Sequence, residues 1–348
     1  MRNFDYSLLV KRTFDQEVIN YIAQIHEFKG RQQLYLAQKT AELDNLVEIA
    51  KRQSTESSNA IEGIGTTSSR LKELMSDKVT PKNRSEEEIL GYKYVLKTIH
   101  ESYEYVPIRS EYILQLHKIL YSFSEQTFGG KYKDTPNEID EKYPDGRVEV
   151  IFKPLQPFET PDAVERLCEE YNKAIEKYGI DPLIAIPIFI HDFLCIHPFN
   201  DGNGRMGRLI TTLLLYKNGY VVGKYISVEK KIEITKDSYY SALSRSSERW
   251  HEEKNDDTPF IKYILGVILA AYRDFEERVN LVGTKMSAMD MVLKAIQNKI
   301  GMFTKSDIME SCPEIGRGSV ENCLKKLYEE GKIGRKGAGR STVYYRLA

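Results

Sequence analysis

One segment constrains the fold of this 348-residue chain more than any other, because the stretch from Leu183 to Ile196 is its most apolar part. The segment is too short to span a bilayer, and it contains His191 and Asp192. We therefore expect a helix that is buried in the core of a folded protein. A proline within the segment, Pro187, indicates that this helix is kinked or starts late.

Apolar residues also recur with a helical period along most of the remaining chain. Ser85 and Glu88 have the spacing of a capping box, and the pairs Thr160-Pro161 and Asp181-Pro182 are typical of an N-cap followed by proline. The pattern therefore predicts a mainly α protein. Its helices are expected at residues 31–53, 85–100, 110–121, 161–177, 183–196, 204–217, 237–248 and 258–278.

Strand patterns are rare before residue 300. Apolar residues alternate between Arg147 and Lys153, behind a turn at Pro144-Asp145-Gly146. This alternation predicts one exposed hairpin on a helical body. The mostly polar stretch 126–146 carries several glycines and prolines, so we expect a loop there.

Residues 286–348 have a different pattern. Helices are predicted at 286–299, at 304–311 with Thr304 as the cap, and at 318–330. Short strands are expected near 332–333 and 341–347, joined by a turn at Gly337-Ala338-Gly339. Three helices followed by a two-stranded wing predict a winged helix-turn-helix domain, with Gly316 in the turn between its last two helices.

The overall charge excludes a general attraction to nucleic acid or to a membrane, since 50 basic and 51 acidic residues nearly cancel. Residues 286–348 alone hold 11 basic and 7 acidic residues, so this part is locally basic. The wing segment contributes five of the basic residues without an acid between them: Lys332, Arg335, Lys336, Arg340 and Arg346. These could contact phosphates, but a winged helix often docks on protein, and both interpretations stay open.

Cysteine usage and the first residues favour an intracellular protein. The four cysteines lie far apart without a CxxC pair, which predicts neither a zinc site nor a disulfide framework. The first residues lack the apolar stretch of a signal peptide, so the cytoplasm is the expected location.

The chemistry of the chain is concentrated in residues 197–208, His-Pro-Phe-Asn-Asp-Gly-Asn-Gly-Arg-Met-Gly-Arg. The glycines around Asn203 let backbone N–H groups converge at the start of a helix, where the helix dipole favours an anion. Arg205 and Arg208 would add two guanidinium groups for phosphate oxygens. Asp201 is a suitable oxygen ligand for Mg2+, and His197 can act as a base near neutral pH.

Each of these features is common when it stands alone. A histidine before proline is usually structural, and a Gly-Asn-Gly turn is usually only a turn. One short segment that supplies a base, a metal ligand, an anion site and two guanidinium groups favours nucleotide binding and transfer of a phosphorus group to a hydroxyl.

The segment matches the motif HPFx(D/E)GN(G/K)RxxR at every specified position, and the chain therefore resembles the Fic family. Fic proteins are mostly helical enzymes that typically move AMP from ATP to a Ser, Thr or Tyr hydroxyl of a protein. The resemblance implies that His197 is the general base, that Asp201 binds Mg2+ and that Phe199 anchors the loop. It implies nucleotide binding by Gly202, Asn203, Gly204, Arg205, Met206, Gly207 and Arg208, with Arg208 on the γ-phosphate. Relatives that phosphorylate carry lysine at the position of Gly204.

A second segment, Ser58-Asn59-Ala60-Ile61-Glu62-Gly63, resembles the inhibitory motif (S/T)xxxE(G/N) of Fic proteins. There the glutamate pairs with the second arginine of the active-site motif, which corresponds to Arg208 here. A carboxylate in a phosphate site competes for the same donors. The resemblance therefore implies autoinhibition by Glu62, with Ser58 in the same helix at about 55–65.

Weaker similarities extend over roughly residues 30–280. Val150, Ile151 and Phe152 lie where Fic proteins carry a hairpin flap that aligns a target protein by strand pairing. Tyr239 and Tyr240 match a tyrosine pair that lines the adenine pocket. Some relatives have asparagine seven residues later, where this chain has Ser247, so nucleotide selectivity is left open.

We therefore expect a protein adenylyltransferase that uses ATP and Mg2+. Its expected parts are an N-terminal helical region at 1–105, a Fic catalytic core at 106–280 and the winged helix at 286–348. Its expected partners are a target protein and the chain itself as a second substrate. Residues 286–348 would dock on DNA or on a protein. No membrane binding is expected, and a homodimer is left open. The alternatives are removal of AMP at the same site, and a DNA-binding regulator whose Fic body senses nucleotide.

Overall fold

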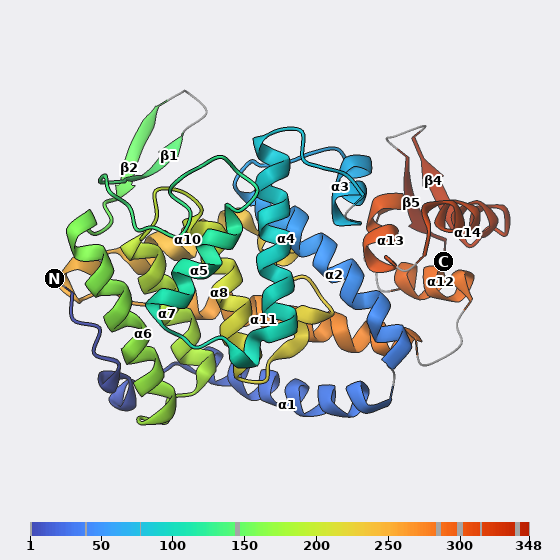
Figure 1. Ribbon diagram of the computed structural model, residues 1–348. Helices are drawn as coiled ribbons and strands as arrows, with labels where there is room; N and C mark the ends of the chain where they lie inside the picture. The colour runs from blue at the N-terminus through green and yellow to red at the C-terminus, as the bar shows by residue number, and fades with distance from the viewer. Residues whose placement is uncertain are drawn as a thin grey trace. The chain divides into compact units, whose positions relative to one another are not determined.

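The computed structural model of the chain describes residues 2–38, 40–76, 78–142, 147–282, 287–297, 302–313, 315–337 and 342–347. The chain forms two compact units, one made of Met1–Gln33 with Ala50–Arg273 and the other of Leu34–Ile49 with Asp274–Ala348. Both units are mainly helical, as predicted (Figure 1). In the part of the chain that is described, no helix has both the length and the apolar character needed to cross a membrane.

The helices that lie wholly or partly in the larger unit are α1 Gln16–Gln38, α2 Thr40–Ile61, α3 Ser68–Met75, α4 Arg84–Ser102, α5 Ser110–Leu120, α6 Thr160–Glu176, α7 Pro182–Ile196, α8 Asn203–Lys217, α9 Val228–Ile234, α10 Lys236–Ser247 and α11 Thr258–Val282. Short 3₁₀ helices occur at Tyr6–Lys11, Tyr103–Tyr105, Pro157–Glu159, Val221–Lys224 and Trp250–Glu252. The single helix predicted at 31–53 is wrong, because α1 runs through Gly30 and α2 is a separate helix.

Helix α7 is the centre of the larger unit, with every residue from Leu183 onward buried between α6 and α8. This confirms the buried helix expected from its apolar sequence. Asp181 caps α7, since its side chain accepts a hydrogen bond from the Leu183 N–H. The helix continues through Pro187, so the expected late start is wrong.

Two of the predicted helix caps are wrong. Asn83 caps α4 by accepting from the Glu86 N–H, so the helix starts before the expected box of Ser85 and Glu88. Thr160 does not cap α6, because a 3₁₀ turn precedes it and its hydroxyl donates to the carbonyl of Gln156. For α4 the cap is thus a second polar residue close by in the sequence, whereas no side chain caps α6.

A small hairpin stands at the edge of the larger unit (Figure 1). Its strands are β1, Ile139–Lys142, and β2, Val148–Phe152, which pair antiparallel. The loop expected over 126–146 is therefore wrong for the residues of β1, whose polar sequence does not alternate. The turn expected at Pro144-Asp145-Gly146 lies outside the described residues.

The described residues of the smaller unit form the helices α12, α13 and α14, parts of α1, α2 and α11, and a three-stranded antiparallel sheet in the order β3-β5-β4. The predicted helices and the two predicted strands are present. The strand β3 is additional, and it pairs with β5. Residues 338–341, which include part of the expected glycine turn and Arg340, lie outside the described residues. The elements are α12 Ala288–Gln297, β3 Phe303–Thr304, α13 Lys305–Ser311, α14 Arg317–Glu329, β4 Ile333–Lys336 and β5 Val343–Arg346.

The four cysteines of the chain form no disulfide, and all four are buried. Burial also raises the pKa of the Cys168 thiol to about 12. The cysteines therefore act as small apolar core residues, in agreement with the absence of a CxxC pair from the sequence.

Candidate active site

His197 ends α7 in the left-handed conformation, with φ at 51°, and begins the turn that leads to α8. Its ring nitrogen Nδ1 lies 3.2 Å from the carbonyl oxygen of Leu194. Because a carbonyl can only accept, Nδ1 carries the proton and Nε2 keeps its lone pair. Burial lowers the pKa of His197 to about 4, so the ring is neutral at physiological pH. The structure therefore leaves Nε2 of His197 unprotonated and able to accept a proton.

The glycine turn after His197 is closed by Asn203. Its side-chain oxygen accepts from the Phe199 N–H at 2.9 Å, and its amide donates to the Phe199 carbonyl at 2.7 Å. Gly202 adopts φ 83°, which brings the chain directly into the first turn of α8. The first N–H groups of α8 are thus left for an anion, while the Asn203 side chain itself has a structural role.

The structure brings Arg208 and the segment 58–62 together. Arg208 is buried and donates through Nε to the Ser58 hydroxyl, and through Nη2 to the Ser58 carbonyl and to Glu62 Oε1. The Nη2–Oε1 distance is 2.7 Å. The remaining nitrogen, Nη1, is buried without a hydrogen-bond partner. Arg208 therefore keeps one donor available for an anion at this site.

Glu62 lies just after the end of α2, in a turn completed by Gly63 at φ 78°. Residues 55–61 are thus the last turns of a longer helix. Lys236 fixes this end, because its ammonium donates to the Ile61 carbonyl at 2.6 Å. A Cβ atom at Gly204 would overlap Glu62 Oε1, so the carboxylate lies directly on the glycine turn.

Arg205 and Asp201 belong to a closed ring of alternating charges. Arg205 pairs with Glu88 at 2.7 Å and lies 3.7 Å from Asp201, and Arg84 pairs with both Glu88 and Asp201 at 2.6 and 2.9 Å. Arg205 is buried and also donates to the Tyr121 hydroxyl. It therefore differs from the second free guanidinium group expected from the sequence.

Asp201 remains chemically suited to Mg2+. Its carboxylate is 41% exposed and lies beside the glycine turn, where one carboxylate together with phosphate oxygens makes a usual Mg2+ site. Its present partner Arg84 is itself 58% exposed and can move into solvent. Among the described residues, no group of three or more His, Cys, Asp and Glu side chains could hold a metal by itself.

The other expected nucleotide residues divide into two groups. Tyr239 is buried against Tyr240 at a ring distance of 5.3 Å, and burial and the Glu62 carboxylate raise the pKa of Tyr240 to about 12. This pair therefore lies near Glu62 and Arg208. Met206 is buried in the core, and Gly207 packs closely against Leu194, so neither offers a side chain to a ligand. The Ser247 hydroxyl lies within hydrogen-bond distance of the buried groups His191 Nε2 and Cys195 Sγ.

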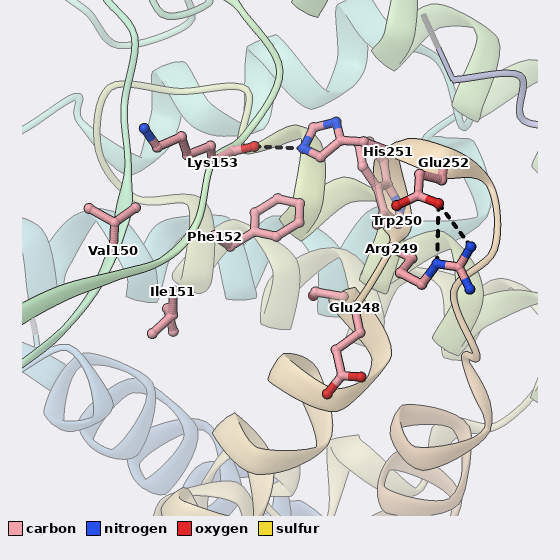
Figure 2. A pocket seen from close by; sticks show the side chains of 10 residues that line it. Val150, Ile151, Phe152, Lys153, Glu248, Arg249, Trp250, His251 and Glu252 are labelled. Carbon is pink, nitrogen blue, oxygen red and sulfur yellow. Dashed lines mark hydrogen bonds and ion pairs between the residues drawn. The ribbon is translucent and has the colours of Figure 1, made fainter.

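The hairpin residues expected to form the flap border a pocket of about 350 Å³ (Figure 2). Val150 and Ile151 are exposed, whereas Phe152 packs against Trp250 and stacks on His251. The His251 imidazole bonds to the Lys153 carbonyl at 2.8 Å, as Figure 2 shows. The exposed side chains of β2, where they are described, are therefore those of Glu149, Val150 and Ile151.

Several residues at the site were not found from the sequence. His117 stacks on Phe199 with ring centroids 3.7 Å apart, accepts from the Gly130 N–H and bonds to the Asp201 carbonyl. Lys133 and Asn137 contact the backbone of the turn that carries His197. All three residues lie far from residues 197–208 in the sequence. Their residue types alone do not indicate that they belong to the site.

These observations define a mainly helical protein in which a neutral histidine and a glycine turn lie between the two buried helices α7 and α8. The Fic/DOC family model matches residues 107–215, and a model of the transcriptional regulator DIP2311-like C-terminal domain matches residues 284–348. A Fido domain-containing protein from Dictyostelium discoideum is 30% identical over 139 residues, which are 39% of this chain and 92% of that protein. The chain belongs to the Fic family.

More distant relatives agree with this assignment. The protein adenylyltransferase Fic of Drosophila willistoni is 24% identical over 272 residues, 75% of this chain and 49% of that protein. The chain thus spans about half the length of that adenylyltransferase. The crystal structure of a Fic family protein from Desulfovibrio desulfuricans shares the fold, with 23% identity, a TM-score of 0.62 and 97% of both chains covered.

Proposed function

We propose that the chain transfers AMP from ATP to a Ser, Thr or Tyr hydroxyl of a target protein. The observation that carries the proposal is the neutral His197, whose Nδ1 is held by the Leu194 carbonyl so that Nε2 can accept a proton beside an anion-binding turn. Fic-type relatives named protein adenylyltransferases support the reaction at the level of the family.

The groups around the turn fit a nucleotide triphosphate. Arg208 offers its unpartnered Nη1, the start of α8 offers backbone N–H groups, and Tyr239 and Tyr240 line a neighbouring surface. Mg2+ on Asp201 would neutralise charge on the phosphates. His197 takes the proton of the target hydroxyl, the oxygen bonds to the α-phosphorus, and the bond to the β-phosphate oxygen breaks to release pyrophosphate.

We further propose that Glu62 holds the enzyme inactive. It occupies donors of Arg208 that a γ-phosphate would need, and Ser58 holds the same guanidinium from α2. Residues 1–105 then act as the regulatory region, 106–280 as the catalytic core and 286–348 as a docking region. The exposed β2 residues Val150 and Ile151 would pair with an extended segment of the target protein.

Labelling with ATP that carries a radioactive α-phosphate tests the reaction and its inhibition together. Glu62→Gly should raise self-labelling by about 5- to 150-fold, the range of a coupling of ~1–3 kcal/mol. Glu62→Gly/His197→Ala should remove labelling but keep ATP binding. Arg208→Ala is the matched control, because it breaks the same ion pair without activating the enzyme.

The possible results separate the parts of the proposal. Equal labelling by wild type and Glu62→Gly would contradict autoinhibition, and labelling by the double variant would contradict the role of His197. Removal of AMP is the alternative reaction, in which Glu62 orients a water. It predicts that wild type, but not Glu62→Gly, releases AMP from a labelled protein.

A second candidate function is DNA binding by residues 286–348, favoured by their match to the C-terminal domain of a transcriptional regulator. Glu321 on α14 pairs with both Arg317 of the same helix and Lys305 of α13, so phosphate contacts would fall mainly to the wing residues Arg335 and Lys336. Fluorescence anisotropy of labelled duplexes with the full chain should show salt-sensitive binding that Lys336→Glu weakens. Binding that neither salt nor this variant changes would favour protein docking.

A further inference from the structure

Four consecutive carbonyl groups of the catalytic turn accept hydrogen bonds from two residues of a distant loop. Lys133 donates through its ammonium to the Ile196 carbonyl at 3.0 Å and through its backbone N–H to the Pro198 carbonyl at 2.9 Å. Asn137 donates through its amide to the carbonyls of His197 at 3.3 Å and Phe199 at 3.0 Å. The backbone on both sides of His197 is therefore fixed from one segment.

The two donors also fix one another. The Lys133 ammonium donates to Asn137 Oδ1 at 2.9 Å, so the amide is oriented with its two N–H groups toward the turn. Lys133 is only 3% exposed, and burial lowers its pKa to about 8. Burying an ammonium group costs free energy unless hydrogen-bond acceptors surround it. The hydrogen bonds of Lys133 are therefore unlike an incidental surface contact.

These hydrogen bonds can stabilise the unusual backbone conformation of His197. The left-handed backbone conformation of His197 is energetically unfavourable for any residue that has a side chain. Contacts with the surrounding structure must therefore stabilise it. Asn137 lies just before the first strand of the hairpin, Ile139–Lys142, so the same segment supports the base of the flap. The histidine and the flap thus depend on one common piece of backbone.

We infer that Lys133 and Asn137 are positioning residues, which hold His197 in its left-handed conformation and at a fixed distance from the flap. This inference rests on the proposed function, in which His197 is the base and β2 docks the target. Neither residue contacts the nucleotide site described above, so they should affect the chemical step rather than ATP binding.

The test compares Asn137→Asp, Lys133→Met and Asp134→Ala in the full-length Glu62→Gly protein. Asn137→Asp keeps the shape but removes the donor, and Lys133→Met keeps the aliphatic stem but removes the ammonium. Asp134→Ala is the matched control, because Asp134 accepts from Asn200 and joins the same two segments without contacting the four carbonyls. Asn137→Asp and Lys133→Met, the two clamp variants, should each lower kcat of self-labelling by about 10- to 100-fold, because a small misplacement of His197 slows the chemical step. They should change ATP affinity by less than about twofold.

Hydrogen exchange of the ATP-free protein supplies a measurement that does not depend on activity. The Lys133 amide, which donates to the Pro198 carbonyl, should exchange at least about tenfold faster in Asn137→Asp and at the wild-type rate in Asp134→Ala. Unchanged exchange or unchanged kcat in both clamp variants would overturn the inference, as would an equal loss in Asp134→Ala. If Glu62→Gly itself gives no labelling, the proposed function fails. The exchange result still decides whether Lys133 and Asn137 hold the turn in place.

Discussion

At the scale of one residue, the burial of His197 has a measurable consequence for the proposed reaction, in which this histidine is the base. Burial lowers its pKa to about 4, whereas an exposed histidine titrates near 6.5. The neutral form should persist down to about pH 5, so kcat/KM of Glu62→Gly should not fall between about pH 8 and 5.5 through this group. Initial labelling rates across this range check the prediction, and half-maximal activity near pH 6.5 would contradict it.

Gly204 and Glu62 occupy the same small space. A Cβ at position 204 would overlap the Glu62 carboxylate, so Gly204→Ala should lower the free energy of unfolding by about 1–3 kcal/mol, as overpacking does. The loss should be smaller when Glu62→Gly has already removed the carboxylate. Urea unfolding of the two single variants and the double variant measures this coupling, and additive losses would show that the overlap has no energetic effect.

At the scale of elements, the proposed autoinhibition depends on the position of the end of α2. Lys236 on α10 donates to the Ile61 carbonyl, one residue before Glu62. Lys236→Met should loosen this end and raise self-labelling by about 2- to 10-fold, since a charged hydrogen bond contributes roughly 1.5–3 kcal/mol. Lys230→Met is a suitable control, because Lys230 pairs with Glu233 on α9. An equal effect of both variants would contradict a specific role of Lys236.

The sequence predicts those elements whose cause is local. The continuous apolar run of α7 and the contiguous residues 197–208 each indicate their role without any distant partner. The break between α1 and α2 carries neither proline nor glycine, and the polar strand β1 has no alternation, so neither is visible before folding. Lys133, Asn137 and Glu88 reach the site only because the chain folds back. Polar residues of these types are common on protein surfaces, so the sequence does not show that these three contact the site.

At the scale of the whole molecule, three histidines whose pKa values are lowered in the fold should make the protein sensitive to acid. Burial lowers the pKa of His100 to about 3 and those of His117 and His197 to about 4. Below about pH 6.5 the unfolded chain binds more protons than the folded chain at these three positions, so their contribution to stability falls as pH falls, by up to about 1.4 kcal/mol per pH unit for each histidine. The urea midpoint should therefore decrease from about pH 7 to pH 5, and His100→Gln should lessen the slope. A constant midpoint would contradict this prediction.

The burial of all four cysteines opens a chemical route to the unknown target. The native chain should react with Ellman's reagent only slowly until urea is added, and rapid reaction in native buffer would contradict their burial. A cysteine introduced at Ile151, which is 43% exposed on the flap, would then react far faster than the native thiols. A photoactivatable cross-linker attached at that position would capture the protein that docks on the hairpin, and the captured polypeptide could be identified from its mass spectrum.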